Sequence, residues 1–421
     1  MKKILSFLLI VMLIATTLLV GCGKNAKSDT ANTNTVPNKS TATSSKVKLV
    51  VWHYWDGQQQ RDALQKLIDK FNASQDKIEV SSVFIPRTEL TKQLTMGVVA
   101  NKLPDIAIVD NPDMASFASM GIFADITDKV APIKDEFYTG PISSCELNGK
   151  YYGVPFGSND LALFYNKDML SAENIQPPTT WDELKIAAKK LTKPGATYGL
   201  AIAAPKNEEG TFQFLPWLLS TGAKFNEIGS PQGIKALSYL TDLIKDHSMS
   251  GEVINWTQND LEKQFVTKKA AMIVDGPWII NTIKSDAPSL NWGVVKIPKD
   301  KIFSSDLGGE NWGIIKGPHE AEAWQFIKFT EQKNIMIEYA ADFGYIPPIK
   351  DIAENDDAIT KDPVMSVFLD ELQYAMPRGP HPKWPQISDA ISTAMQESFT
   401  QIKTPEQAAK DAQVKIDSII K

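Results

Sequence analysis

The sequence predicts an α/β fold built from parallel βαβ units and divided into two domains. β-Branched runs of strand length alternate with stretches of helical apolar spacing, which is typical of parallel sheets covered by helices. The chain has 421 residues, and its body at 46–421 is long enough for two domains. Apolar residues make up 43% of the chain and charged residues 22%, the ordinary composition of a globular protein.

The first residues have the pattern of a bacterial lipoprotein signal. Two lysines precede the apolar run 4–20, and the segment closes on Gly21-Cys22. A charged start, an apolar stretch and a small-residue exit indicate a secretory signal peptide over residues 1–21. The exit resembles a lipobox, which makes Cys22 the lipidated first residue of the mature chain. The alternative is an N-terminal membrane helix, because the run could almost span a bilayer.

Residues 22–45 are expected to be a disordered tether. They are nearly all small or polar and bury too little apolar surface to offset the entropy of ordering. No later segment has 18 uncharged apolar residues, so we expect no second membrane element. The protein is therefore expected at the extracellular face of the bacterial cell membrane, held by its lipid anchor alone.

The body begins with alternating strands and helices. Its first strand is the β-branched run at 46–52. A helix follows, because apolar residues recur at helical spacing at Ala63, Leu64, Leu67, Ile68 and Phe71. The next expected elements are a strand at 78–85, a helix at 89–99 and a short buried strand at 106–109 that ends on Asp110 and Asn111.

Downstream elements follow the same alternation. Residues 163–165 read as a core strand, and Thr180 with Glu183 forms a capping box that opens a helix to Leu191. A buried strand is expected at 270–274, followed by a helix with Pro277 near its first position. The last expected elements are an amphipathic helix at 321–330 and a final helix capped by Thr404.

Composition and motifs exclude several classes of function. The net charge is −6, and no basic stripe favours a nucleic-acid partner. The chain lacks the nucleophile-elbow, zinc-protease, phosphate-loop and dinucleotide motifs. The four histidines are isolated, and a lipidated Cys22 leaves Cys145 without a disulfide partner. We therefore expect no metal, no cofactor and no enzymatic activity, and we expect a monomer.

Aromatic residues gather where strands are expected to end. Ligands of open α/β sheets bind beyond the carboxyl ends of strands, and an aromatic face there can pack against the apolar face of a sugar ring. The alternative for any single Trp is a place in the core. The residues of this kind are Trp52, Tyr54, Trp55, Trp278, Trp312 and Trp384.

Several blocks of sequence resemble the extracellular solute-binding proteins of carbohydrate ABC transporters, the group that includes maltose-binding protein. The resemblance covers nearly all of 46–421. Its most specific blocks are 152–155, 163–168, 178–184, 270–278, Gly308-Gly309, Ala323-Trp324 and 377–384.

The resemblance implies a periplasmic-binding-protein type of fold, in which two discontinuous α/β lobes are joined by a hinge with a ligand cleft between them. It implies an N-terminal lobe of 46–158 plus 309–330 and a C-terminal lobe of 159–308 plus 331–421. The hinge crossings are then expected near 157–160, 306–311 and 328–332. The implied partners are a carbohydrate ligand and the permease subunits of an ABC importer.

The resemblance and the strand-end placement together predict the ligand contacts. Arg87 and Arg378 could clamp a carboxylate or phosphate. The alternative is a buried ion pair or a contact to a hydroxyl, which the scarcity of basic residues near the strand ends favours. Asp160 is expected to face the cleft beside Asn159. The candidates are Trp52, Trp55, Asp56, Arg87, Asp110, Asn111, Asn159, Phe212, Trp278, Asn311, Trp312 and Trp384.

The expected function is capture of a sugar or oligosaccharide and its delivery to an ABC importer. One alternative keeps the binding role but changes the ligand to a phosphorylated polyol such as glycerol phosphate. Another is a surface carbohydrate hydrolase, which would need two carboxylates roughly 5–10 Å apart across the cleft.

Overall fold

A computed structural model of the chain describes residues 46–100 and 102–421. The expected signal peptide at 1–21, the tether at 22–45 and the lipidation site at Cys22 lie outside these residues. Within the described part, no helix combines the length and the apolar character needed to cross a membrane.

The first lobe is built on a five-stranded sheet of order β2-β1-β3-β12-β6. Its strands are β1 (Val47–His53), β2 (Ile78–Phe84), β3 (Ile106–Asp110), β6 (Val154–Pro155) and β12 (Glu310–Ile314). Its helices and small hairpin are α1 (Gln58–Ser74), α2 (Arg87–Ala100), α3 (Met114–Ser119), α4 (Thr127–Val130), α5 (Thr139–Ser143), β4 (Glu146–Leu147), β5 (Lys150–Tyr151), α12 (Glu320–Thr330), α13 (Lys333–Phe343) and α14 (Lys350–Glu354).

The sheet of the first lobe is mixed. β1 lies between β2 and β3 and is parallel to both, as the alternation of strands and helices predicts. β12 returns from the other lobe and is antiparallel to β3, with Trp312 opposite Ile108. All five apolar residues predicted for the first helix are buried on α1.

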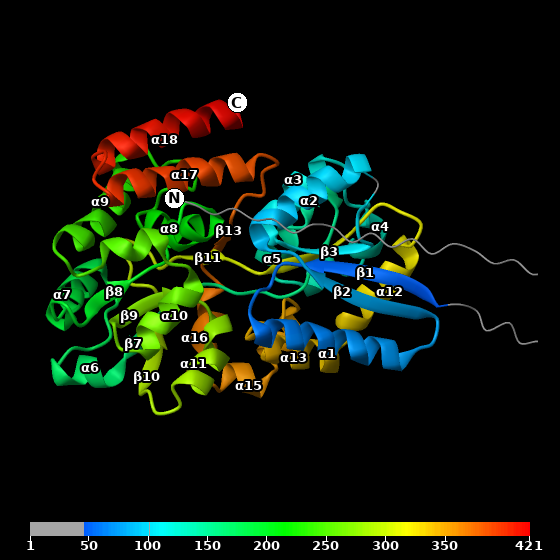
Figure 1. Cartoon of the computed structure of the whole chain (residues 1–421), viewed down its shortest axis with the longest axis horizontal. Coiled ribbons are helices and arrows are strands. Elements are labelled where there is room, and N and C mark those ends of the chain that lie inside the picture. The colour runs from blue at the N-terminus through cyan, green and yellow to red at the C-terminus, as the bar shows by residue number, and fades with distance from the viewer. Residues whose placement is uncertain (1–45, 101) are drawn as a thin grey trace, which may run out of the picture. The chain divides into compact units, whose positions relative to one another are not determined.

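The second lobe is built on a four-stranded sheet of order β10-β7-β9-β8. Its strands are β7 (Ala162–Asn166), β8 (Tyr198–Ala201), β9 (Ala270–Asp275) and β10 (Trp292–Val295). Its helices are α6 (Lys167–Ala172), α7 (Trp181–Leu191), α8 (Glu208–Ser220), α9 (Pro231–Lys245), α10 (Gln258–Val266), α11 (Ile280–Asp286), α15 (Asp357–Thr360), α16 (Met365–Glu371), α17 (Trp384–Phe399) and α18 (Pro405–Ile420). In Figure 1, α17 and α18 lie side by side at the C-terminal end of the chain.

Local signals place the second lobe's elements where they were expected. Thr180 accepts a hydrogen bond from the Glu183 backbone N–H, and the Glu183 side chain returns a contact to the Thr180 backbone, so the predicted capping box is present. Thr404 caps α18 by accepting from the Gln407 N–H. β7 is antiparallel to β9 while β8 is parallel to it, so this sheet is also mixed.

The chain passes between the lobes in paired segments. The stretch between β6 and β7 and the stretch that carries β11 (Ser305–Leu307) run antiparallel, with Asn159 bridged to Gly308. Gly309 has φ +114°, and a Cβ there would lie 2.1 Å from the carbonyl oxygen of Gly157. Only glycine accommodates this backbone and this close approach of the two crossings.

The third crossing differs from the expected position at 328–332. α13 packs beside α1 (Figure 1), and Met336, Tyr339 and Phe343 belong to the first lobe's core. The chain enters the second lobe only after this helix, where Phe368 of α16 packs in a cluster with Phe164 of β7. The assignment of residues from 331 onward to the C-terminal lobe is therefore wrong for α13 and α14, because buried apolar residues of both helices pack in the first lobe's core. After α16, β13 (Ala375–Pro377) pairs in parallel with β11.

Candidate functional site

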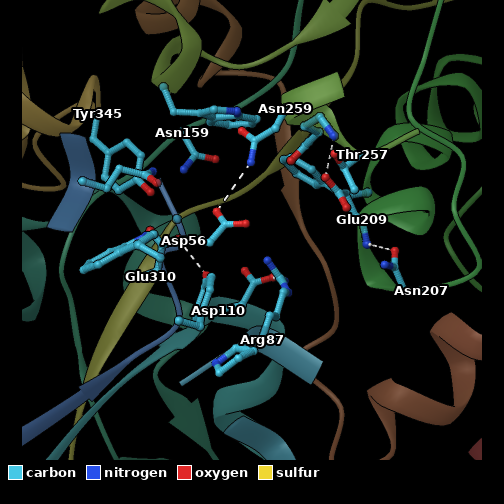
Figure 2. A pocket seen from close by; sticks show the side chains of 18 of the residues that line it. Asp56, Arg87, Asp110, Asn159, Asn207, Glu209, Thr257, Asn259, Glu310 and Tyr345 are labelled. Carbon is cyan, nitrogen blue, oxygen red and sulfur yellow. Dashed lines mark hydrogen bonds and ion pairs between the residues drawn. The ribbon is translucent and has the colours of Figure 1, made fainter. Parts of the chain in front are cut away.

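A cavity of about 350 Å³ lies between the two lobes, at the carboxyl ends of β1 and β3. The second lobe contributes the first turns of α8 and α10 and the turn after β9 (Figure 2). This is the position at which ligands of open α/β sheets bind. The lining residues are Tyr54, Trp55, Asp56, Gln60, Phe84, Pro86, Arg87, Asp110, Asn159, Asn207, Glu209, Phe212, Thr257, Gln258, Asn259, Trp278, Gly309, Glu310, Tyr345 and Arg378.

Trp278 provides a half-buried aromatic surface in the cavity. It lies in the short helical turn Pro277–Ile279 that follows β9. A Cβ on Gly276 would lie 1.9 Å from the indole ring, so the ring folds back over a backbone that must be glycine. Phe212 of α8 lies beside it, with ring centroids 6.2 Å apart. The two rings provide a stacking surface from the second lobe.

A buried ion-pair network, centred on Arg378 and Asp110, lies at the floor of the cavity. Both terminal nitrogens of the Arg378 guanidinium contact the Asp110 carboxylate, with Nη2–Oδ1 at 2.7 Å and Nη1–Oδ2 at 3.1 Å. Nη1 also donates to Glu208 Oε1 at 2.7 Å, and Arg87 forms an ion pair with Asp110 from the other side. Burial opposes ionisation of Asp110, but the two guanidinium groups outweigh it and lower the pKa of the carboxyl. The ion-pair alternative for Arg378 is thereby confirmed.

Glu310 carries a carboxyl group at the hinge side of the cavity. Tyr54 donates its hydroxyl hydrogen to Glu310 Oε1 at 2.7 Å, whereas buried Oε2 has no partner within the described residues. Burial, together with the nearby charge of Asp110, raises the pKa of Glu310 to about 7. This carboxyl can therefore donate or accept a hydrogen bond near neutral pH.

Polar side chains of both lobes meet at the cavity mouth. Asn259 Nδ2 of α10 lies 3.5 Å from Asp56 Oδ1 of the first lobe, as the dashed line in Figure 2 shows. Asn159 also lies in the cavity (Figure 2), on the crossing between β6 and β7. Its neighbour Asp160 is fully buried and does not line the cavity, so the expectation that it faces the cleft is wrong.

The structure brings seven of the predicted contacts together around this cavity. They come from both lobes and from the crossings, although they are distant in sequence. They are Trp55, Asp56, Arg87, Asp110, Asn159, Phe212 and Trp278.

Two residues of β12 that were expected in the site lie elsewhere. Trp312 is 1% exposed and packs edge-on against Phe156 and Phe326 in the first lobe's core. Asn311 points away from that core, because successive side chains of a strand alternate, and donates to Ser144 Oγ at 2.9 Å. A central position in the sheet therefore keeps both side chains out of the cavity.

Three further candidates lie outside the cavity lining. Trp384 is fully buried in the second lobe's core and donates from Nε1 to Glu208 Oε2 at 2.9 Å. Asn111 accepts from Arg378 Nη2 at 3.3 Å and donates to the Leu307 carbonyl. Trp52 is half-buried and packs with the cluster that contains α2 and α3 residues. None of the three lines the cavity.

Other lining residues were not among the candidates. Tyr54 is one of the aromatic residues at the expected end of the first strand, but it was not among the predicted contacts. Glu209 and Asn259 lie in the first turns of α8 and α10, and Tyr345 follows α13. No local pattern marks these three, because only the packing of the two lobes brings them to the cavity. Among the described residues, no group of His, Cys, Asp and Glu is arranged to hold a metal ion.

Residues 66–367 match the family described as bacterial extracellular solute-binding protein. The chain belongs to this family. The resemblance found in the sequence is confirmed, and so is the predicted fold of two α/β lobes with a cleft between them. The match runs from α1 to α16 and so includes all three crossings.

Relatives and solved structures of the family agree with this assignment. The maltotriose-binding protein of Pyrococcus abyssi is 27% identical over 385 residues, which cover 87% of this chain and 80% of that protein. A maltose-bound structure of T. maritima MalE3 is 26% identical with a TM-score of 0.82, over 88% of this chain and 99% of that one. A solute-binding protein of Thermotoga lettingae, bound with α-D-tagatose, is 25% identical with a TM-score of 0.82, over 89% and 100% of the two chains.

Proposed function

We propose that this chain captures a sugar or short oligosaccharide in the cavity between its lobes and delivers it to an ABC importer. The observation that carries the proposal is the pairing of an aromatic surface, Trp278 and Phe212, with carboxylate and amide groups from both lobes around one cavity. Aromatic faces pack against sugar C–H groups, while the polar groups bind hydroxyls. The names of the relatives, a maltotriose-binding protein among them, support the same ligand class.

The cavity volume favours a small ligand. About 350 Å³ is at the lower end of the range of ~300–1,000 Å³ that small-molecule sites occupy. Contacts from both lobes stabilise the closed arrangement relative to an open one, because a ligand shifts a conformational equilibrium by its differential affinity for the two states. Binding and release, without bond cleavage, then complete the protein's task.

The proposal includes a lipid anchor at Cys22. The Gly21-Cys22 exit and the polar segment 22–45 favour a protein tethered to the extracellular face of the membrane, near the permease that would accept its ligand. We propose that it acts as a monomer with the permease subunits as its protein partners.

A thermal-shift screen tests the binding role. The protein is heated with a panel of neutral mono-, di- and trisaccharides with gluco-, galacto- and manno-configurations, together with glycerol phosphate. A ligand that binds only the folded state raises the melting temperature by mass action. A rise with a neutral sugar supports the proposal. A rise with glycerol phosphate alone contradicts it, and release of shorter sugars during incubation would indicate a hydrolase instead.

A further inference from the structure

The positive charges in the cavity are already compensated by the protein. The Arg378 side chain is 3% exposed, and each of its three nitrogens contacts a protein acceptor: Leu307 O, Asp110, Glu208 and Asn111. Arg87 pairs with the same Asp110. Two guanidinium groups therefore face two carboxylates, and no lysine lines the cavity.

Besides Glu310, whose pKa burial raises to about 7, two further carboxyl groups of the cavity lining remain without a cation. Asp56 follows β1 in the first lobe, and Glu209 lies in the first turn of α8 in the second. Neither forms an ion pair with any described residue. Arg61 is close to Asp56 but donates to its backbone carbonyl rather than to its carboxylate.

The groups that contact these carboxylates are neutral. Glu209 Oε1 accepts the backbone N–H of Gln258 at 2.6 Å, and Asp56 Oδ1 lies 3.5 Å from the Asn259 amide. Figure 2 shows Asp56 and Glu209 on different sides of the same cavity. The cavity thus has an excess of negative charge, with one uncompensated carboxylate on each lobe. A bound anion would be repelled by both lobes, whereas an ammonium group would be attracted by both.

We propose that Asp56 and Glu209 make the cavity selective by charge, so that it excludes sugar phosphates and uronates and binds protonated amino sugars at least as well as their neutral parents. The inference rests on the proposed function and adds the charge class of the ligand. Asp56 and Glu209 are then the residues that determine this charge specificity. Hydroxyl and ammonium groups both donate hydrogen bonds to carboxylates, but only the ammonium adds a favourable Coulomb interaction.

Isosteric pairs separate charge from size. The neutral sugar that gives the largest thermal shift in the panel is compared with its 2-amino-2-deoxy analogue, in which an ammonium replaces a hydroxyl. The second pair is its 6-carboxamide and its 6-carboxylate, which have nearly the same shape. Affinities are measured by calorimetry at low salt for the wild type, for Asp56→Asn/Glu209→Gln, and for Asp76→Asn, which removes an exposed carboxylate in the turn between α1 and β2.

We expect the carboxylate to bind at least about tenfold more weakly than the carboxamide in the wild type and in Asp76→Asn. The double variant should reduce this ratio toward one and should remove any advantage of the amine. Equal affinities for carboxylate and carboxamide in the wild type, or an amine that binds tenfold more weakly than its parent, would overturn charge selection. If no neutral sugar binds in the panel, the proposed function itself has failed.

Discussion

Arg378 and Asp110 form a bidentate ion pair that joins the segment after β13 to the end of β3. The same guanidinium reaches Glu208 at the start of α8, so one side chain links groups from both lobes. Glu208 is held in turn by Trp384 Nε1. The floor of the cavity is therefore a network in which both buried carboxylates, Asp110 and Glu208, are paired with Arg378.

Arg378→Met should destabilise the protein strongly. It leaves Asp110 and Glu208 buried without their main cation, and breaking a buried pair in this way costs about 3–5 kcal/mol. Urea denaturation followed by circular dichroism measures the change. The variant Arg378→Met/Asp110→Asn should recover part of the loss, because one uncompensated charge is removed. An unfolding midpoint unchanged from the wild type would contradict the network.

Trp278→Ala should weaken sugar binding more than it weakens folding. The indole is half-buried and faces the cavity. Its removal loses several tens of Å² of apolar contact with the sugar, at ~25 cal/mol per Å², and also loosens neighbouring contacts. Together these losses should weaken the binding free energy by on the order of 2 kcal/mol. This corresponds to about a thirtyfold weaker dissociation constant by calorimetry.

Trp217→Ala is the matched control for this prediction. Trp217 lies in the second lobe's core and does not line the cavity, so its truncation should cost about 3–5 kcal/mol of folding stability while the folded fraction keeps most of its affinity. The assignment of Trp278 to the site is wrong if the two variants behave alike, with both melting early and both binding normally when folded.

Local sequence signals were sufficient for most elements of the fold. The β-branched run before Trp52, the helical spacing on α1 and the capping box at Thr180 each depend on neighbours in sequence, so they could be identified without the tertiary structure. The position of α13 could not, because its apolar face would fit against either lobe. Only its packing on α1 decides between them.

The site was harder to predict, for a related physical reason. Trp278 and Trp384 both stand near the start of a helix after a proline or a loop, yet one faces the cavity and the other fills the core. Local sequence does not distinguish these outcomes, since an indole is buried favourably in either place. Glu209 likewise comes to line the same cavity as Asp56 only when the two lobes meet.

Stability should fall as the pH rises from about 5 to 8, in part because of Glu371. This carboxyl is fully buried at the end of α16, and burial raises its pKa to about 8 from an ordinary value of 4.5. Between these two values the folded protein holds a proton that the unfolded protein has released, so the free energy of unfolding decreases with pH. Urea denaturation at pH 5 and pH 8 measures the difference.

Glu371→Gln should reduce this pH dependence and stabilise the protein at pH 8. The neutral amide can still accept the Ile297 N–H that Glu371 Oε1 accepts at 2.7 Å. Asp76→Asn, at an exposed position, should leave the pH dependence as it is in the wild type. A Glu371→Gln variant whose pH profile matches that of the wild type would show that this carboxyl is not responsible.

The lipid anchor is testable at the N-terminus of the native protein. If Cys22 is the lipidated residue, mass spectrometry should find a mature chain that begins there and carries acyl mass. Cys22→Ser should release the protein from the membrane or leave it unprocessed. A mature chain that begins elsewhere without acyl mass would remove the anchor from the proposal.

Small-angle X-ray scattering with and without ligand tests the central claim, that one sugar contacts both lobes across the cleft. The cavity is lined by Trp278 and Glu209 from one lobe and by Asp56 and Asp110 from the other, so a bound ligand should favour closure. We expect the radius of gyration to decrease when the sugar identified in the thermal-shift panel is added to saturation. A sugar that binds by calorimetry but leaves the radius of gyration unchanged would contradict the account.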